Sequence, residues 1–221
     1  MSIFNIIRSG SLSEYYVLAP ERYDPRRLQK ITQDSVSLEE LFSIENPTLS
    51  KRNIFDNEKY IVIDTGDSFE GIINNGKKEI LGKDVGSSKK TVTYGDVIIS
   101  RLRPYLRQIG FLDKSFFDGK KNILVSTEYF ILKSRDSDIN SSWIVPFLLL
   151  SEIQELLSRA QEGGHHPRFS KATLSEIKIP MNIVDDRKRL SFEVEKYIDR
   201  IQLSYKFLRN LTNNIENIMQ I

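Results

Sequence analysis

Hydrophobic and polar positions follow three different patterns along this 221-residue chain. Between residues 60 and 133, short β-branched and aromatic runs alternate with Gly, Asn and Asp turn signals, which is typical of short strands. Between residues 140 and 161, apolar residues recur at steps of three and four, which predicts a helix. From residue 185 to 221 the helical pattern is unbroken. These patterns predict an α+β protein, with a compact, sheet-rich domain and flanking helices followed by a long C-terminal helix.

Local signals place the individual elements. Ser37, followed three residues later by Glu40, is a capping box that predicts a short helix. The expected strands cover residues 60–64, 72–73, 91–94, 97–100, 109–112, 125–132 and 177–180, with a turn at residues 74–76, a loop over 46–57 and a helical turn over 172–176. Because no long crossover helices separate these strands, we expect a mostly antiparallel or mixed sheet. The predicted organisation is a leader (1–34), a domain (35–180) and a helical region (181–221).

Two rows of the C-terminal helix repeat every seven residues. One row holds Val194, Ile201, Leu208 and Ile215, and the other holds Tyr197, Ser204, Leu211 and Ile218. Rows of this kind are the a and d positions of a coiled coil. They predict an interface with a second copy or another subunit, formed by Val194, Tyr197, Ile201, Leu208, Leu211, Ile215 and Ile218. The alternative is an amphipathic helix that folds back on its own domain.

Charge is distributed unevenly. The whole chain has a net charge of +2, whereas residues 77–121 hold eleven Lys and Arg against five Asp and Glu. Arg101 and Arg103 flank Leu102 at strand spacing, so both guanidiniums are predicted to face the same side. Arginine forks suit phosphate oxygens and guanine edges, and a neighbouring Tyr can stack on a base. The predicted DNA-binding residues are Lys89, Lys90, Arg101, Arg103, Tyr105, Arg107, Lys120, Lys121, His166, Arg168 and Lys171.

The last three of these residues belong to a loop, Gly163–Lys171, that we expect to join the domain to the helical region. Ser170 is a candidate N-cap for the helical turn after it, where backbone N–H groups can help to bind an anion. The adjacent His165 and His166 are the chain's two His and make a poor metal site, because metal sites draw three or four ligands into one geometry. No metal is therefore expected.

Catalytic motifs are missing from the sequence. The chain has no Cys, no phosphate-binding GxxxxGK[ST] loop, no GxGxxG turn and no Gly-x-Ser-x-Gly motif. Glu176 and Lys178 have the Glu-x-Lys spacing of many metal-dependent nucleases, a tripeptide that is common by chance. The longest apolar run contains Pro146 and is far shorter than the ~20 residues of a membrane span. We therefore expect a non-catalytic, cytoplasmic protein without a membrane segment.

Three stretches carry a resemblance to a known family. They are Gly95–Tyr105 (GDVIISRLRPY), Val125–Leu132 (VSTEYFIL), and Pro167–Lys171 with Ile177–Pro180 (PRFSK and IKIP). From about Val36 onwards the chain resembles the DNA specificity subunits of type I restriction–modification systems. The resemblance implies a target recognition domain followed by a helical spacer, which reads one half of a bipartite DNA site.

The resemblance also implies partners. Methyltransferase (modification) subunits and a restriction/translocase subunit would assemble on this chain, and they, not this chain, would bind S-adenosylmethionine and ATP. A usual specificity subunit has two recognition domains and two spacers, so this chain resembles a half-size form, or a fragment, that acts as a homodimer on double-stranded DNA. Residues 181–186 depart from the family pattern before the helix, and residues 1–34 have no clear counterpart. The alternatives are a coiled-coil adaptor that binds protein, a recognition domain fused to a methyltransferase, and a divergent metal-dependent nuclease.

Overall fold

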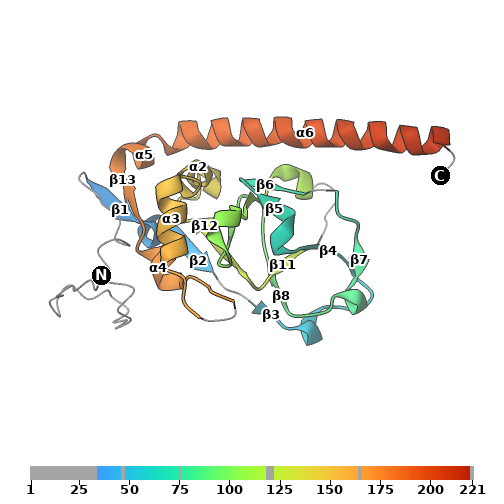
Figure 1. Ribbon diagram of the computed structural model, residues 1–221, viewed down its shortest axis with the longest axis horizontal. Helices are drawn as coiled ribbons and strands as arrows, with labels where there is room; N and C mark the ends of the chain where they lie inside the picture. The colour runs from blue at the N-terminus through green and yellow to red at the C-terminus, as the bar shows by residue number, and fades with distance from the viewer. Residues whose placement is uncertain (1–33, 46–47, 75, 118–121, 164–165, 220–221) are drawn as a thin grey trace, which may run out of the picture.

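The computed structural model describes residues 34–45, 48–74, 76–117, 122–163 and 166–219 (Figure 1). The predicted leader lies outside these residues except for Asp34. Lys120, Lys121, His165 and the last two residues of the predicted C-terminal helix also lie outside them. The described chain forms a sheet-rich head and a long helix that runs along one side of it (Figure 1).

Two sheets build the head. The first is antiparallel, with the strand order β10 (Ile109–Phe111), β9 (Val97–Ser100), β12 (Tyr129–Ser134) and β2 (Phe42–Glu45). The second has the order β3 (Thr48–Leu49), β8 (Lys89–Thr91), β11 (Asn122–Ser126), β4 (Lys59–Ile63) and β7 (Ile80–Leu81). In the second sheet β11 and β4 are parallel, and the other pairs are antiparallel. The α+β class and the mixed sheet are therefore confirmed.

The alternation of side chains along the strands explains how the layers stack. Val97 and Ile99 of β9 join the core beneath the helices, whereas Ile98 between them joins the core shared with the second sheet. In β12, Phe130 points to the first core and Tyr129 to the second. Because successive side chains of a strand point to opposite faces, the first sheet is the middle layer between helices and the second sheet.

The helical layer follows the predicted pattern with one interruption. The helix expected over residues 140–161 is a 3-10 turn η8 (Ser141–Trp143), then α2 (Ile144–Leu148) and α3 (Ser151–Arg159), with a break at residues 149–150. The capping box is confirmed at α1 (Leu38–Leu41), where Glu40 Oε1 accepts from the Ser37 N–H at 2.9 Å. The remaining short turns are η3 (Lys51–Asn53), η4 (Thr65–Asp67), η5 (Gly82–Asp84), η6 (Pro104–Leu106) and η7 (Lys114–Phe116).

Two predictions of strands and loops need correction, and one turn was not predicted. The strand predicted over residues 125–132 is two strands, β11 and β12, separated by a turn at Thr127–Glu128. The loop predicted over residues 46–57 contains β3 and η3. The hairpin of β5 (Ser68–Phe69) and β6 (Ile72–Ile73) turns at Glu70 and Gly71, which the sequence reading did not select, whereas Asn75 of the predicted turn at residues 74–76 lies outside the described residues. Both turn residues have positive φ, as two-residue hairpin loops require.

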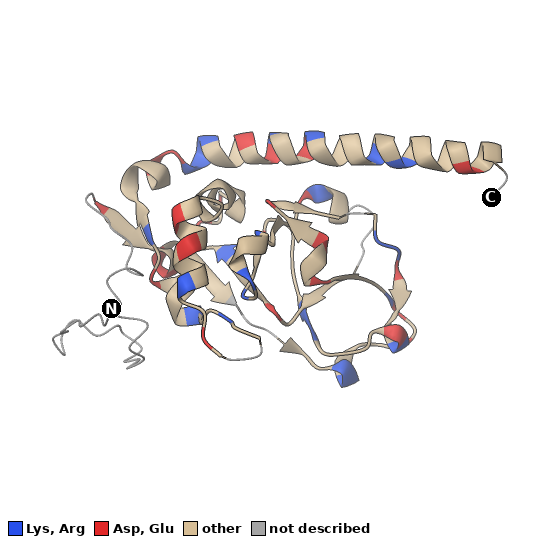
Figure 2. Cartoon of the chain, viewed as in Figure 1, with Lys and Arg blue, Asp and Glu red and all other residues tan. Residues whose placement is uncertain are grey.

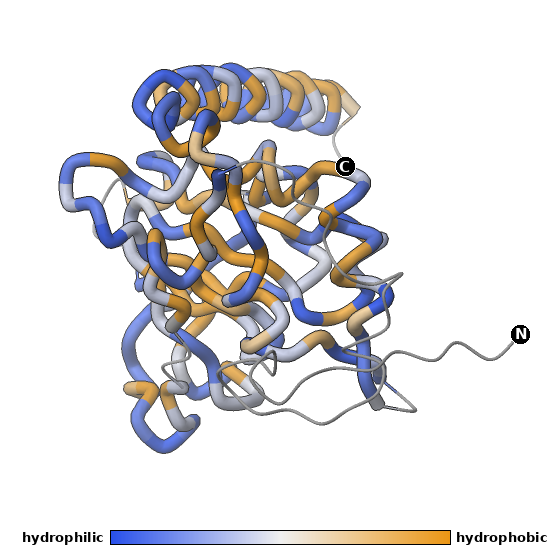
Figure 3. Tube along the Cα trace, turned by 90° about the vertical axis from the view of Figure 1, so that its left-hand side faces the viewer, coloured by the Kyte–Doolittle hydropathy of each residue, from blue (hydrophilic) through white to orange (hydrophobic). Residues whose placement is uncertain are grey.

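The C-terminal helix α6 (Arg187–Met219) follows the short helix α5 (Met181–Asp185), so the predicted unbroken helix has a break at Asp186. Ser191, Ile198 and Gln202 are buried against the head, and Val194 packs partly against its core. Hydrophobic turns recur along α6 beside the head, while most other hydrophobic segments lie within it (Figure 3). The fold-back alternative is therefore correct for the first half of α6, where Val194 is already partly covered by the head, and its place in an intermolecular interface stays a prediction.

The joint between head and helix is not where the sequence suggested. The chain reaches α6 through α4 (Lys171–Ser175), β13 (Lys178–Pro180) and α5 (Figure 1). The loop Gly163–Lys171 instead belongs to the head, because Arg168 bridges to Leu102 and to Glu162 and the Phe169 side chain is buried. Ser170 is the N-cap of α4, as predicted, and accepts from the Thr173 N–H at 3.1 Å.

Candidate nucleic-acid interface

The loop between β9 and β10 holds its tip in a strained conformation. Arg103 (φ 44°) and Arg107 (φ 51°) both adopt the left-handed backbone region on either side of η6. Such conformations cost of order 1 kcal/mol each and persist where the surrounding contacts hold them. Here the Leu106 N–H donates to Arg103 O at 2.8 Å and the Arg107 N–H donates to Pro104 O at 2.7 Å. Tyr105, at the tip, is 64% exposed.

This backbone corrects the prediction that Arg101 and Arg103 share one face of a strand. Strand β9 ends at Ser100, so neither arginine lies within it. Arg101 turns towards Glu128, whereas Arg103 is exposed and makes no ion pair with any residue that the structure describes. The strand alternation fails because the left-handed residue at position 103 redirects the chain.

Glu128 brings together two arginines that are distant in sequence. It accepts from Arg101 Nε at 2.8 Å and from Arg168 Nε at 2.9 Å and Nη2 at 2.6 Å. The backbone joins the same segments, because the Arg101 N–H donates to Glu128 O at 3.0 Å and the Phe169 N–H donates to Arg101 O at 3.2 Å. The hydrogen bonds from Arg168 lower the pKa of Glu128 to about 2, burial opposes this shift, and Arg101 lowers the pKa further.

Arg168 and Arg101 differ in how many of their guanidinium nitrogens are bonded to protein. Arg168 also donates from Nη1 to His166 O at 2.9 Å, so each of its nitrogens bonds to protein. Arg101 is held through Nε, and its two Nη groups make no hydrogen bond within the described residues. A guanidinium pinned at Nε presents its outer edge in a fixed orientation, which suits a phosphate or a base edge. Arg101 is thus the better placed of the two to contact a ligand.

Parts of the two basic patches of the sequence contribute to one surface. Leu102 and Arg168 pair as an antiparallel bridge, and a hollow of about 270 Å³ is lined from both loops by Arg103, Leu106, His166 and Pro167, among others. Thr65 and Gln108 also line the hollow, and no pattern in the sequence pointed to either of them. Lys171 is exposed at the start of α4. The structure therefore joins residues from both predicted patches on one side of the head.

Other predicted cations are already engaged. Arg107 Nε pairs with Glu70 Oε1 at 2.6 Å, and Lys89 Nζ pairs with Asp64 Oδ1 at 3.2 Å. Lys90 is only 2% exposed and its ammonium donates to Tyr129 O, so the prediction that it lies on a DNA-facing surface is wrong. The reason is register: Lys90 opposes Val125 of β11 and points into the head.

Carboxylates are the residues that sequence reasoning missed. Glu128 and Glu70 each hold a predicted DNA-binding arginine, and no pattern in the sequence links either acid to its partner. Basic and acidic positions are interspersed over the head rather than separated into large areas of one sign (Figure 2). Within the described residues, no group of three or more His, Asp or Glu is arranged to hold a metal ion, and no helix has the length and apolarity to cross a membrane.

The loop surface, the stacked sheets and the long helix can be compared with known proteins. The model of the type I restriction modification DNA specificity domain matches residues 31–217, which is most of the chain. The chain belongs to this family. The specificity subunit of the type I restriction enzyme EcoDI from Escherichia coli is 25% identical over 149 residues, which cover 66% of this chain and 31% of that protein.

Solved structures of the family share the fold. One, from a study of complex assembly and conformational transition in a type I R-M system, has a TM-score of 0.58 and 18% identity, and the match covers 87% of this chain and 49% of the other. The HsdS subunit from Thermoanaerobacter tengcongensis has a TM-score of 0.52 and 19% identity, covering 85% of this chain and 47% of that one. The chain thus spans about a third of the curated relative and about half of each solved chain.

Proposed function

We propose that this chain is a non-catalytic DNA sequence-recognition unit that reads one half of a bipartite DNA site. The observation that carries the proposal is the match to a DNA specificity domain over residues 31–217. The loop surface supports it, because Arg101, Arg103 and Tyr105 are presented by a constrained backbone on one side of the head. A preorganised loop loses little conformational freedom when it docks on a duplex.

The proposal extends to the assembly. Two copies would pair antiparallel through α6 about a two-fold axis, so that two heads face inverted half-sites. The support is the exposure of the heptad rows: Ile201, Leu208, Leu211, Ile215 and Ile218 are between 39% and 81% exposed. Methyltransferase subunits and a restriction/translocase subunit would dock on the pair in the cytoplasm and supply the S-adenosylmethionine and ATP chemistry.

DNA binding tests the first part of the proposal. The full chain, with its cognate methyltransferase subunit present, should bind duplexes that contain the methylated motif mapped in the host genome. Affinity should fall steeply with salt: the logarithm of the association constant should fall by about 0.9 per tenfold rise in salt concentration for each phosphate contacted. Undetectable binding to every duplex, at low salt and with the partner present, would contradict the proposal.

The oligomeric state tests the second part. Ile201→Asp combined with Leu208→Asp should convert a dimer into a monomer, as measured by light scattering. The matched control is Leu203→Asp, since Leu203 is 68% exposed on the same helix but lies outside both heptad rows. An unchanged mass in the double variant would exclude pairing through these rows.

A coiled-coil adaptor is the second candidate, because the same exposed rows of α6 would serve a protein partner equally well. Replacing Arg101 and Arg103 by Ala separates the two candidates. These changes should weaken DNA binding under the first function and leave an adaptor's assembly unchanged.

A further inference from the structure

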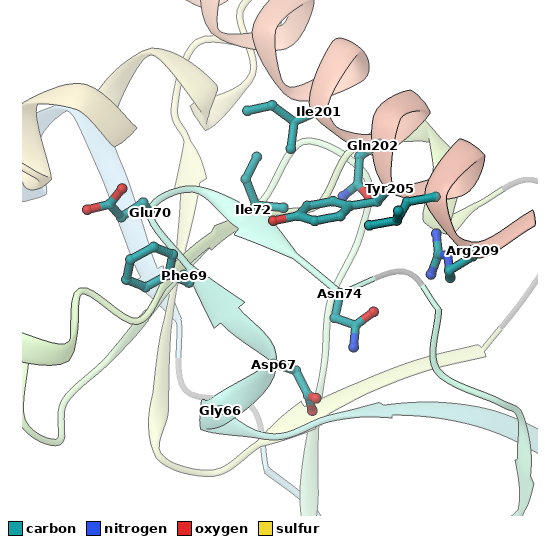
Figure 4. Close-up of a pocket in the computed structure, with 11 residues that line it drawn as sticks. Gly66, Asp67, Phe69, Glu70, Ile72, Asn74, Ile201, Gln202, Tyr205 and Arg209 are labelled. Atoms are coloured by element: carbon teal, nitrogen blue, oxygen red, sulfur yellow. The ribbon is translucent and has the colours of Figure 1, made fainter. Parts of the chain in front are cut away.

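A cavity separates α6 from the head about halfway along the helix. It has a volume of about 570 Å³ and lies between the segment Gly66–Asn74 and the helix face around Tyr205 (Figure 4). Its lining combines apolar side chains that remain open to solvent with the charged residues Asp67, Glu70 and Arg209. Phe69 is 59% exposed, Tyr205 53%, Leu208 59% and Ile201 39%. Exposed aromatic and aliphatic side chains around one hollow indicate a surface that another molecule covers.

The occupant must be largely apolar on the side that faces α6. Between residues 201 and 219 the helix carries only three charged side chains, Lys206, Arg209 and Glu216. At 100° per residue, Lys206 and Glu216 lie on the side away from the heptad rows. Arg209 lines the cavity itself, together with Asp67 and Glu70. A nucleic-acid backbone would find no row of cations there, whereas an apolar helix would find matching side chains.

The same chain offers such a helix. Leu211, Ile215, Ile218 and Met219 are all at least 44% exposed, and the described residues place nothing over them. In an antiparallel pair, a positions of one helix face d positions of the other. One register places Ile201 against Ile218, Ser204 against Ile215 and Leu208 against Leu211, each pair occurring twice.

That register uses every heptad position from 201 to 218. A shift of one heptad in one direction would bring Ile218 of the second copy against Val194, which already packs on its own head. A shift in the other direction would leave Ile201 and Ser204 uncovered. The register that covers all the exposed positions is therefore also the one that brings Ile218 of a second copy beside Ile201, at the mouth of the cavity.

We propose that the cavity is a docking site for the α6 end of a second copy, so that Phe69 in the head contacts Ile218 of that copy. This rests on the homodimer in the proposed function and goes beyond it. Helix pairing alone would leave each head attached only to its own helix. A contact between head and partner helix fixes each head against both helices and limits its rocking relative to the other head.

Thiol crosslinking tests the contact directly, because the chain contains no Cys. Ile201→Cys is mixed with Ile218→Cys, and Phe69→Cys is mixed with Ile218→Cys, with one member of each mixture carrying a larger tag. Oxidation should link the first pair, and a short thiol-to-thiol crosslinker should link the second. Each chain then holds one thiol, so every linked product joins two copies.

Phe55→Cys mixed with Ile218→Cys is the matched control, since Phe55 is 68% exposed but does not line the cavity. It should give no product. A link between positions 201 and 218 without a link between 69 and 218 would overturn the cavity proposal and leave helix pairing intact. A monomeric mass at all concentrations would defeat both the proposal and the homodimer, while DNA recognition would be decided separately by the binding assay.

A second measurement does not depend on crosslinking. Phe69→Ala should weaken self-association by roughly tenfold, because buried aromatic anchors dominate such contacts. Phe55→Ala, at a similarly exposed Phe, should leave the dissociation constant unchanged. Equal dissociation constants for Phe69→Ala and the unmodified chain would count against the docking site.

Discussion

Ser142 in the head and Ser191 in α6 share a hydrogen bond, Oγ to Oγ at 2.8 Å, and both side chains are buried. This pair is the centre of a polar seam. Glu195 Oε1 accepts from Asn140 Nδ2 at 2.7 Å, and Gln202 Nε2 donates to Ile73 O at 2.9 Å. Because hydrogen bonds demand particular partners at particular distances, the seam fixes the helix at one axial position and rotation relative to the head.

Glu195 accepts hydrogen bonds from three residues along this seam, Asn140, Tyr94 and Ser191. Glu195→Ala removes the acceptor for Asn140, and also for Tyr94 Oη, which lies 3.3 Å away. We expect the free energy of unfolding to fall by about 1–2 kcal/mol, because partly buried donors lose their partner. Urea denaturation measures it. Glu193→Ala on the same helix is the control and should change stability far less.

Arg101 and Arg168 should separate into a ligand-contacting and a structural arginine. Arg168→Ala leaves Glu128 without two hydrogen bonds and should lower the free energy of unfolding by about 1–3 kcal/mol. Arg101→Ala should cost less stability, yet reduce DNA affinity and lower the salt slope by about one unit. Arg159→Ala, at an exposed position of α3, should do neither. Equal effects of the two variants on DNA affinity at matched stability would contradict the separation.

Glu128 should make the protein sensitive to acid. Arg168 and Arg101 lower the pKa of this carboxyl from 4.5 to about 2. Because the folded-state pKa is depressed, its stabilisation is present above the unfolded pKa and is lost as pH falls from about 4.5 towards 2. The full effect is roughly 3 kcal/mol. Glu128→Gln should be less stable than the unmodified protein at pH 6, and this difference should shrink towards pH 2, as followed by urea denaturation at each pH.

Lys90 should make the stability of the protein depend on pH at the alkaline end. Burial is the main cause that lowers the pKa of its ammonium to about 8, nearby Arg101 lowers it further, and Glu128 opposes the shift. The unfolded chain then holds more protons than the folded one between about pH 8 and 10.5, so stability rises with pH across that window. Lys90→Met should remove this rise, which is about 1 kcal/mol or more by pH 9.5.

The control for this measurement is Lys89→Met. Lys89 is next to Lys90, but its ammonium pairs with the exposed carboxylate of Asp64, and its replacement should keep the rise. If the unmodified protein and Lys90→Met gave parallel stability curves from pH 7 to 9.5, Lys90 would not carry a depressed pKa.

The sequence predicted best those features that depend on neighbours along the chain. The capping box at Ser37 and Glu40, the N-cap at Ser170 and most strand positions are confirmed, because periodicity and capping are local. Residues whose fate depends on distant partners were less predictable. Lys90 belongs to a basic run but faces inwards, because β8 pairs with β11 in a particular register.

The candidate site shows the same limit. Arg101, Arg103 and Tyr105 were identified from residue type and spacing, and the structure brings Arg101 and Arg103 close to the His166–Arg168 loop. Glu128 was missed, since its role arises where a turn between β11 and β12 meets two other loops. A left-handed residue at position 103 and a salt bridge across 40 residues are tertiary events, and neither has a local signature.

Among the described residues, the first and last strands of the head pair with each other, with Ser35 opposite Pro180 and Ser37 opposite Lys178. The two ends of the segment between β1 and β13 therefore lie side by side in one two-stranded sheet. A segment whose ends are adjacent can be replaced as a unit by another head without a change in the position at which the chain enters α5 and α6. Recombination within β1 and β13 would give the protein a new head, while α6 kept the same starting point and direction.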